Sequence, residues 1–352
     1  MLYVDTSFWD NQKSIEFASH AIHAFQPMES VNTQLNHSII RYHYTSASAM
    51  MAILNTNAKG DGTVRFTDSR YMNDRSELLY FIKRLLEFLN NDEDAFPFCH
   101  KVVDELLLKK HSAEEYISLR VPELEEIELD PFVYAKSRHF LFCLSKDGDS
   151  LHMWNYYIHN GNYQGYNIGI NVYDFLKHFD DRGKLPDKKN PIKFYFGDVL
   201  YSPKKQEIEI EGICKSIEEF GTNSESNSLS LQLGMARLWE YIECYGLFFK
   251  DNSFSDEKEY RIVIQVDEVL AGTSISSYFK HNTEMNVEFT FFERNGVLVP
   301  CLMVPLVKKS VKRITMAPIL ENKIASYSLN EYLVNNEYED IEIKQSDTPI
   351  RY

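Results

Sequence analysis

The chain has 352 residues, of which 44% are apolar, 14% aromatic and 25% charged, and its formal net charge at pH 7 is −15. The aromatic and apolar content excludes an intrinsically disordered chain. The acidity disfavours non-specific binding of nucleic acids, because phosphate backbones are themselves negatively charged.

The cysteines and the hydrophobic runs predict a soluble, cytoplasmic protein that does not bind membranes. The cysteine count is odd and there is no Cys-x-x-Cys pair, so we expect neither a disulfide framework nor a zinc site. The first residues lack the basic and apolar regions of a signal peptide. No apolar run approaches the roughly 18–20 residues that a membrane span needs.

The pattern of residues predicts an N-terminal arm over residues 1–37 and a single domain over 38–352. We expect helical insertions near 77–130 and 203–249. Strands are expected at 39–45, 63–69, 138–145, 164–173, 192–201 and 259–266, followed by a hairpin that turns on Asn295-Gly296. Strands outnumber a regular β-α alternation, so the expected fold class is α+β, with a mixed, largely antiparallel sheet core.

The segment RYHYTS at 41–46 places a histidine within a strand, between two tyrosines. Hydrogen bonds from His43, Tyr44, Thr45 and Ser46 could hold the ribose or amide of a ligand. The structural alternative is a strand histidine that is satisfied within the fold.

The loop SRYMNDRSE at 69–77 lies between a predicted strand and a predicted helix. Asn73 and Asp74 can form a turn, and Asp74 or Ser76 can cap the helix. Loops on a rigid sheet often carry ligand-binding groups, so Asn73 and Asp74 are candidate cofactor contacts.

The segment SLHMWNYYIHNG at 150–161 predicts a short aromatic helix. Trp154 and Tyr157 each combine a flat apolar ring with a polar tip, which suits stacking on a nicotinamide or adenine ring. The alternative is a buried aromatic helix that packs in the core.

The segment FSDEKEYRIVI at 254–264 leads into a strand. The strand period of two puts Glu257, Glu259 and Arg261 on one face and Lys258 on the other. Two carboxylates beside a buried strand are costly unless they are exposed, paired or functional. The alternative to a functional site is a structural pair between glutamate and arginine at a strand end.

Six motifs in this order resemble the bacterial family known as domain of unknown function 2971. The family pattern is an aromatic-His/Lys-Tyr-Thr-Ser opening, an Asn-Asp-x-x-Glu loop, a Cys-hydrophobic-Ser strand, a Met-Trp-x-x-Tyr helix, a Glu-x-Glu-Tyr-Arg strand and a Ser-x-x-Pro-x-Arg ending. The corresponding residues here are 42–46, 73–77, 143–145, 153–157, 257–261 and 346–351. The resemblance covers about residues 39–352.

The opening strand and the late Glu-x-Glu strand more distantly resemble ADP-ribosyltransferase domains. That resemblance implies cleavage of the nicotinamide–ribose bond of NAD⁺, without a metal, and transfer of ADP-ribose to a protein, a nucleic acid or water. Toxins and phage-defence effectors are the expected context, with a cognate regulator or antitoxin as partner.

The same resemblance implies roles for individual residues. His43 would hold a ribose of NAD⁺ and face the catalytic Glu259 across the cofactor site, while Glu257 would orient the acceptor. Arg261 would lie beside these carboxylates. Ser150, Trp154 and Tyr157 are all candidates for the middle position, and the sequence does not choose among them.

Two other classes of function remain open. One is a non-catalytic module that senses NAD or a nucleotide, or that binds a partner through its acidic surface. The other is a metal-dependent nuclease or hydrolase, with Asp74 and Glu77 as its acidic residues, although the ligand spacing of a metal site is missing from the sequence.

Overall fold

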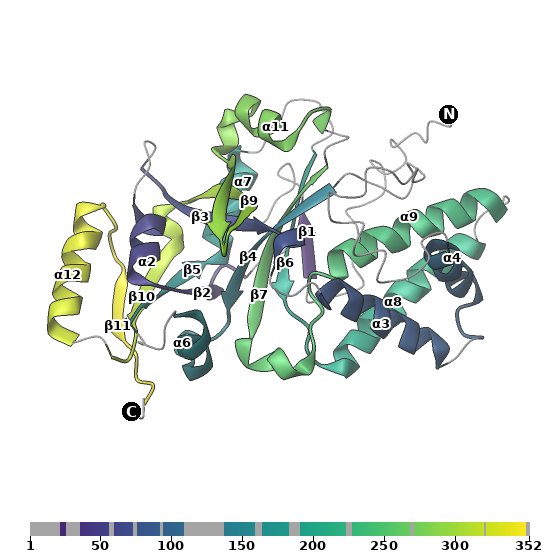
Figure 1. The fold of residues 1–352 in the computed structure, drawn as a ribbon, viewed down its shortest axis with the longest axis horizontal. Helices are drawn as coiled ribbons and strands as arrows, with labels where there is room; N and C mark the ends of the chain where they lie inside the picture. Colours follow the sequence, from purple (N-terminus) through teal and green to yellow (C-terminus); the bar gives the residue numbers. More distant parts are fainter. Residues whose placement is uncertain are drawn as a thin grey trace.

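The computed structural model describes residues 22–25, 36–55, 60–72, 76–91, 94–108, 137–158, 164–182, 191–222, 227–267, 271–319 and 322–349. Within these ranges the fold is α+β, as predicted, and is built on one large open sheet (Figure 1). The strands are β1 (Ile22–Phe25), β2 (Ile40–Thr45), β3 (Gly62–Asp68), β4 (Ser137–Ser145), β5 (Tyr166–Asn171), β6 (Ile192–Asp198), β7 (Glu259–Asp267), β8 (Glu288–Arg294), β9 (Val297–Leu306), β10 (Val311–Met316) and β11 (Glu342–Gln345).

The helices gather on both sides of this sheet. They are α2 (Ala47–Leu54), α3 (Ser76–Asn90), α4 (Pro97–Leu108), α6 (Leu151–Tyr157), α7 (Val172–Arg182), α8 (Pro203–Thr222), α9 (Asn227–Tyr245), α11 (Ile275–His281) and α12 (Asn322–Asn335). None of the described helices is long and apolar enough to cross a membrane.

The sheet runs in the order β1-β6-β7-β4-β2-β5-β10-β11 and is antiparallel except between β10 and β11. It forks at β4. One edge of β4 pairs with β7 along its whole length. The other edge pairs with β3 at the middle of β4, through Phe140 and Leu141, and with β2 at its end, where Tyr42 lies opposite Ser145. This fork brings β2 and β7 to opposite edges of the same end of β4.

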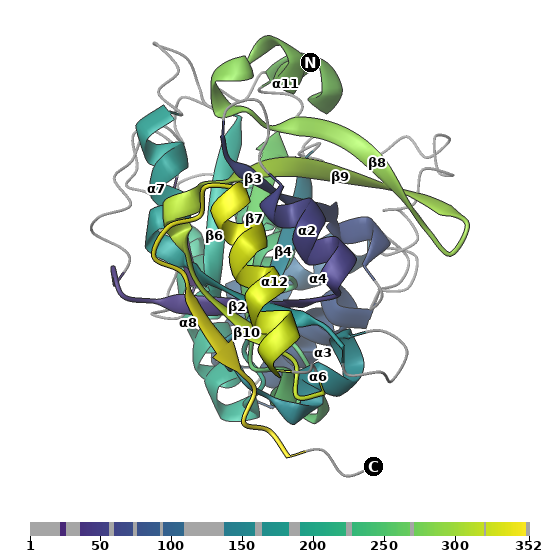
Figure 2. The same ribbon diagram turned by 90° about the vertical axis from the view of Figure 1, so that its left-hand side faces the viewer.

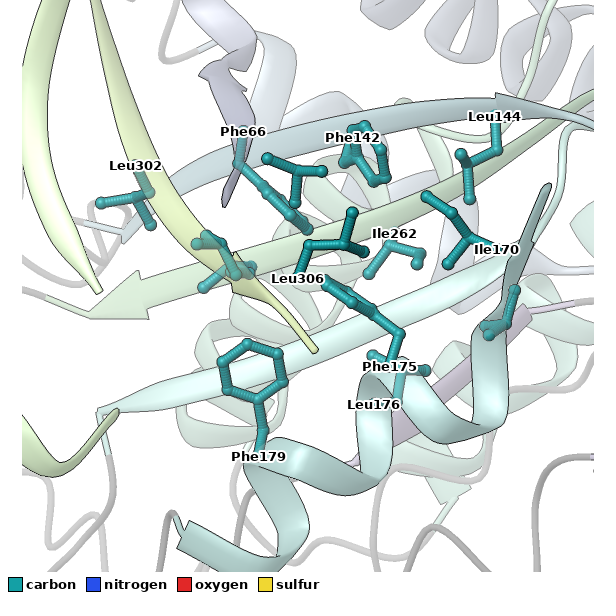
Figure 3. Close-up of a cluster of buried hydrophobic side chains, with 14 of the residues drawn as sticks. Phe66, Phe142, Leu144, Ile170, Phe175, Leu176, Phe179, Ile262, Leu302 and Leu306 are labelled. Carbon is teal, nitrogen blue, oxygen red and sulfur yellow. The ribbon is translucent and has the colours of Figure 1, made fainter. Parts of the chain in front are cut away.

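The strands at the centre of the sheet bury both faces, as the apolar run in residues 138–145 predicts. On β4, Phe140, Phe142 and Leu144 join one core, whereas Leu141 joins the other. Figure 3 shows the first core, in which side chains of β4, β7 and β9 meet those of helix α7. The two cores together fix β4 and β7 as the rigid centre of the molecule.

Different helices cover the two faces. Helices α2, α7, α11 and α12 contribute to the core shown in Figure 3. Helices α3, α4, α8 and α9 form a separate layer over the opposite face, on the right of Figure 1. This layer corresponds to the two predicted helical insertions, of which residues 109–130 lie outside the described part of the chain.

The structure differs from the sequence-based boundaries at several places, and the strand expected at 192–201 ends at Asp198. The strand expected at 164–173 ends at Asn171, because the Asn171 side chain accepts a hydrogen bond from the backbone N–H of Asp174 and caps α7. Residues 22–25 of the expected N-terminal arm form a strand that pairs with β6. The predicted hairpin is observed, with Asn295 and Gly296 both at positive φ.

Candidate functional site

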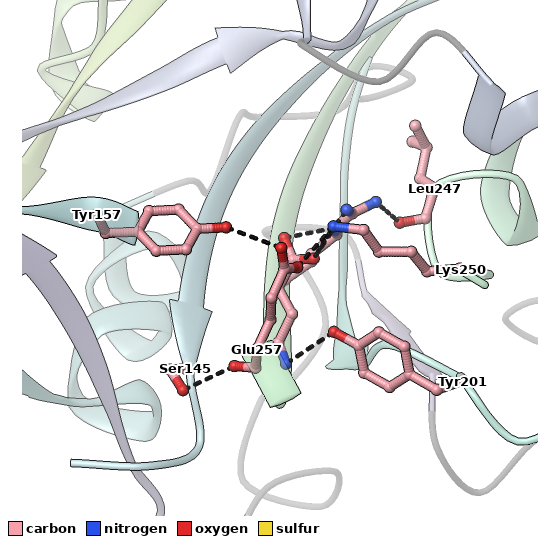
Figure 4. Close-up of polar contacts among 8 residues, drawn as sticks. Ser145, Tyr157, Tyr201, Leu247, Lys250 and Glu257 are labelled. Atoms are coloured by element: carbon pink, nitrogen blue, oxygen red, sulfur yellow. Dashed lines mark hydrogen bonds and ion pairs between the residues drawn. The ribbon is translucent and has the colours of Figure 1, made fainter. Parts of the chain in front are cut away.

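A cluster of charged side chains lies where β7 begins (Figure 4). Residues 252–257 form a short 3₁₀ helix, and Lys258 then adopts a left-handed conformation with φ of 44° before the strand starts at Glu259. Glu257 therefore precedes the strand. The sequence-based expectation that Glu257 and Glu259 share one face of that strand is wrong, because Glu257 lies outside the strand. The turn nevertheless directs both carboxylates toward the same lysine, Lys250.

Glu259 forms a buried ion pair with Arg261. The Arg261 Nε donates to Oε1 of Glu259 and Nη2 donates to Oε2, each at 2.9 Å, while Nη1 donates to the carbonyl oxygen of Leu247. Both side chains are buried. Burial alone would raise the pKa of Glu259, but the positive charges of Arg261 and Lys250 outweigh it and lower the pKa to about 2. Glu259 is therefore an ionised carboxylate that is held in one orientation.

Lys250 bridges the two glutamates. Its Nζ lies 2.6 Å from Oε2 of Glu257 and 3.4 Å from Oε2 of Glu259, and its side chain is buried. The other oxygen of Glu257, Oε1, accepts a hydrogen bond from the hydroxyl of Tyr157 at 3.2 Å. Burial and the charges of Glu257 and Glu259 raise the pKa of Tyr157, so this hydroxyl keeps its proton at neutral pH.

Neighbouring strands fix the backbone that carries these side chains. The hydroxyl of Ser145 donates to the carbonyl oxygen of Glu257, and the backbone N–H of Glu259 donates to the hydroxyl oxygen of Tyr201. Cys143, which lies opposite Arg261 on β4, adds a hydrogen bond to Glu259 and helps to keep its pKa low. The Cys-hydrophobic-Ser motif of residues 143–145 is thus part of the site.

A second network positions helix α6, which carries Tyr157. The carboxylate of Asp149 accepts hydrogen bonds from the Trp154 indole N–H at 2.7 Å, from the hydroxyls of Ser346 and Thr348, and from the backbone N–H of Asp347. These interactions lower the pKa of Asp149, although burial opposes them. The C-terminal segment therefore ties down the loop that precedes α6.

The structure distinguishes among the three candidates for the middle position. Ser150 caps α6 by accepting a hydrogen bond from the backbone N–H of Met153. Trp154 is fully buried and packs edge-on against Tyr44, so its ring cannot stack on a ligand. Tyr157 is 43% exposed and contacts Glu257. Of the three, it is the residue that joins the charged cluster.

The structure does not bring His43 to this cluster. Tyr42 pairs with Ser145, which pairs with Glu259, so these three residues share one face of the sheet. His43, the next residue along β2, points to the opposite face, where its ring lies 5.0 Å from that of Phe142. The expectation that His43 and Glu259 face each other across one cleft is wrong, because the register of β2 against β4 puts the two side chains on opposite faces of the sheet.

The environment of His43 is that of a structural histidine. Its Nδ1 lies 3.4 Å from the carbonyl oxygen of Cys143, to which it can donate. Burial lowers the pKa of His43 to about 4, against the smaller effect of this hydrogen bond. The ring is therefore neutral at pH 7.

The other predicted ligand-binding residues have structural roles or lie outside the described residues. The Tyr44 hydroxyl donates to the carbonyl oxygen of Asp147 and accepts from the backbone N–H of Ser150. Thr45 is buried, and Ser46 caps helix α2 through the backbone N–H of Ala49. Asn73 and Asp74 fall among the residues that the structure does not describe.

Sequence reasoning missed Lys250, Tyr201 and Asp149. A signal for Lys250 was present, since it directly follows the apolar segment 247–249 and a buried lysine requires anionic partners. Asp149 and Tyr201 had no comparable signal, because their partners come from remote strands and from the C-terminal segment. Among the described residues, no group of three or more His, Cys, Asp or Glu side chains is arranged to hold a metal ion.

Comparison with known proteins identifies the central part of the chain. Residues 153–262 match the family model described as "Protein of unknown function (DUF2971)", which supports the family resemblance and includes the motifs at 153–157 and 257–261. The matched segment includes Tyr157, Tyr201, Lys250, Glu257 and Glu259. No curated protein and no solved structure matches the chain.

Proposed function

We propose that this chain, whose residues 153–262 match the DUF2971 family, cleaves the nicotinamide–ribose bond of NAD⁺ at the charged cluster. ADP-ribose then passes to a macromolecule or to water. The observation that supports this proposal is the state of Glu257. Its Oε1 accepts a hydrogen bond from a neutral, half-exposed group, the hydroxyl of Tyr157, whereas the oxygens of Glu259 contact Arg261 and Lys250.

Cleavage of a bond between a ribose and a good leaving group develops positive charge on the ribose. A carboxylate next to the ribose stabilises that charge, and it is most effective when it is already ionised and oriented. Lys250 fixes the orientation of Glu257 through a contact of 2.6 Å with its Oε2. We therefore assign to Glu257 the contact with the ribose, with a ribose hydroxyl donating to Oε1 beside the hydroxyl of Tyr157, since a carboxylate oxygen can accept two hydrogen bonds.

Glu259 has a different role in this proposal from the one expected from the sequence. Arg261 occupies both of its oxygens and Lys250 lies near one of them, so Glu259 has no free edge to offer a substrate. Its fixed negative charge instead orients Lys250, which in turn orients Glu257. Glu259 is thus a positioning residue, and Tyr157 supplies an exposed ring beside the scissile bond.

A second candidate is a module that binds NAD or a nucleotide without cleaving it. The observation that favours it is the charge balance of the cluster, in which Lys250 and Arg261 offset Glu257 and Glu259. A neutralised pair of carboxylates stabilises a developing cation less than a free pair does. Binding without turnover would separate this candidate from the first.

The experiment is to incubate the purified chain with NAD⁺ labelled in its adenosine half, with and without cell lysate. We expect nicotinamide release by the wild type, and a loss of at least about a hundredfold in Glu257→Gln, since one well-placed electrostatic group contributes about that much. The matched control is Glu211→Gln, which removes an exposed carboxylate paired with Lys215.

The outcomes distinguish the candidates. If calorimetry detects NAD⁺ binding but no nicotinamide appears, the non-catalytic module is the better account. If the chain neither binds nor cleaves NAD⁺, both candidates fail. Equal rates for Glu257→Gln and Glu211→Gln would contradict the role given to Glu257.

A further inference from the structure

The hairpin formed by β8 and β9 extends from the body of the molecule beside helix α11 (Figure 2). Within the described part of the chain, β9 is the one ladder partner of β8. Apart from that ladder, the main chain of residues 288–294 makes no hydrogen bond with the main chain of another described residue. Among the described residues, the outer edge of β8 is therefore an unpaired strand edge, which is a template for pairing with another strand.

Two prolines on β9 indicate which β8 residues direct their main chain outward. Phe291 lies opposite Pro300, and Thr63 lies opposite Pro305. Because proline has no N–H, we expect Pro300 and Pro305 to lie in non-hydrogen-bonded pairs of their ladders. One alternation of hydrogen-bonded and non-hydrogen-bonded residues along β9 places both prolines in such pairs. With that alternation, the N–H and C=O groups of Phe289, Phe291 and Glu293 point away from β9.

One face of the hairpin is apolar and exposed. Phe291 and Leu298 lie on the same face, because their partners in the ladder are Pro300 and Glu293. They are 55% and 68% exposed. On the other face the guanidinium of Arg65 covers the ring of Phe292 at 3.8 Å. An exposed apolar face next to an unpaired strand edge is a typical site for the addition of a strand.

The charges along β8 identify what kind of strand fits. A two-fold axis through Phe291 would place Glu288 of one copy opposite Arg294 of another, at both ends of the paired segment. The same axis would bring the two Phe291 rings together. We propose that β8 pairs antiparallel with β8 of a second copy of this chain, so that the two hairpins join the sheets of the two copies into one continuous sheet.

Two features bear on the strength of this pairing. Arg294 already donates to the carbonyl oxygen of Tyr71, but a guanidinium has five N–H donors and retains others for a carboxylate. The net charge of −15 per chain repels a second copy. Salt at about 0.15 M screens that repulsion beyond roughly 8 Å, so the contact requires at least this ionic strength.

The test is sedimentation velocity of the full chain over a range of micromolar concentrations, on the wild type and five variants. We expect the wild type to form dimers. Glu288→Arg and Arg294→Glu each place like charges opposite one another twice, and should each raise the dissociation constant about tenfold or more. The double variant Glu288→Arg/Arg294→Glu restores opposite charges and should restore the dimer.

Phe291→Lys provides a test that does not involve the contact between Arg294 and Tyr71, and it should also yield monomers. Tyr327→Lys is the control, since it changes a 76% exposed residue on helix α12, away from the hairpin, and should leave the dimer intact. A wild type that stays monomeric at every concentration would overturn the proposal. So would a dimer that persists unchanged in Phe291→Lys, with folding of each variant checked by circular dichroism.

Discussion

The hydroxyl of Tyr157 donates to Oε1 of Glu257 at 3.2 Å and joins residues that are 100 positions apart in the chain. Tyr157 lies on the last turn of α6, and Glu257 ends the 3₁₀ helix before β7. This contact connects an exposed aromatic ring to the buried ion network of Lys250, Glu259 and Arg261. The interface between α6 and the start of β7 is where we propose that the ligand binds.

Removal of this hydroxyl should affect activity more than stability. Tyr157→Phe deletes one half-exposed hydrogen bond, so the free energy of unfolding should fall by about 1 kcal/mol or less. If Tyr157 orients the ligand at Glu257, nicotinamide release should fall about tenfold or more. The control is Tyr156→Phe, whose ring is 71% exposed, and the two variants should unfold at similar urea concentrations.

Loss of Glu259 should destabilise the fold. Glu259→Gln leaves the Arg261 guanidinium buried without its anion, which costs about 3–5 kcal/mol in the free energy of unfolding. The comparison variant is Glu342→Gln, because Glu342 pairs with Arg313 on the surface and its loss should cost no more than about 1 kcal/mol. Urea unfolding measures both. Equal costs would show that the buried pair contributes no more than an exposed one.

Acid should weaken the same ion pair. The pKa of Glu259 in the folded chain, about 2, lies below its ordinary value of 4.5. The unfolded chain therefore binds more protons between these values, so the stabilisation is complete above about pH 4.5 and is lost as the pH falls toward 2. Glu259→Gln should lack this component of the pH dependence, and urea unfolding at a series of pH values would detect the difference.

His43 should make its own contribution at a higher pH. Burial lowers its pKa from 6.5 to about 4, so below pH 6.5 the unfolded chain takes up a proton that the folded chain excludes. Stability should thus fall as the pH drops from 6.5 to 4, by up to about 1.4 kcal/mol per pH unit. His43→Gln should flatten this part of the curve. An unchanged slope would mean that His43 titrates normally in the folded chain.

Asp149 should be required to hold the C-terminal segment and helix α6 in place. Asp149→Asn replaces a charged acceptor of several hydrogen bonds, among them those of Trp154 and Ser346, and should cost about 2–3 kcal/mol. The neighbouring control, Asp347→Asn, alters an exposed side chain and should cost less than about 0.5 kcal/mol. Thermal unfolding of both variants provides the measurement. Similar melting temperatures would argue against this network as a structural support.

The sequence predicts the sheet better than it predicts the site. The run at 138–145 is apolar at successive positions, and this feature correctly indicates a strand buried on both faces. The boundary between β5 and α7 was predicted less well. Asn171 caps the helix through its side chain, while the apolar residues before and after it form one continuous run.

The site could be predicted in part. Glu257, Glu259 and Arg261 are close in sequence, so local spacing was enough to group them. The face to which His43 points depends on the pairing of Tyr42 with Ser145, a contact between residues 103 positions apart that local periodicity does not contain. A shift of one residue in that register would have reversed the result. Lys250 joins the cluster through the chain path after α9, which is likewise a tertiary feature.

The most direct test of the account is the rate of nicotinamide release from NAD⁺ by the wild type and by Glu257→Gln, compared at equal concentrations of folded protein. We predict measurable release by the wild type and a loss of at least about a hundredfold in the variant, because Glu257 carries the oxygen assigned to the ribose. Equal rates in the two proteins, or no release by a wild type that is folded and pure, would contradict the account.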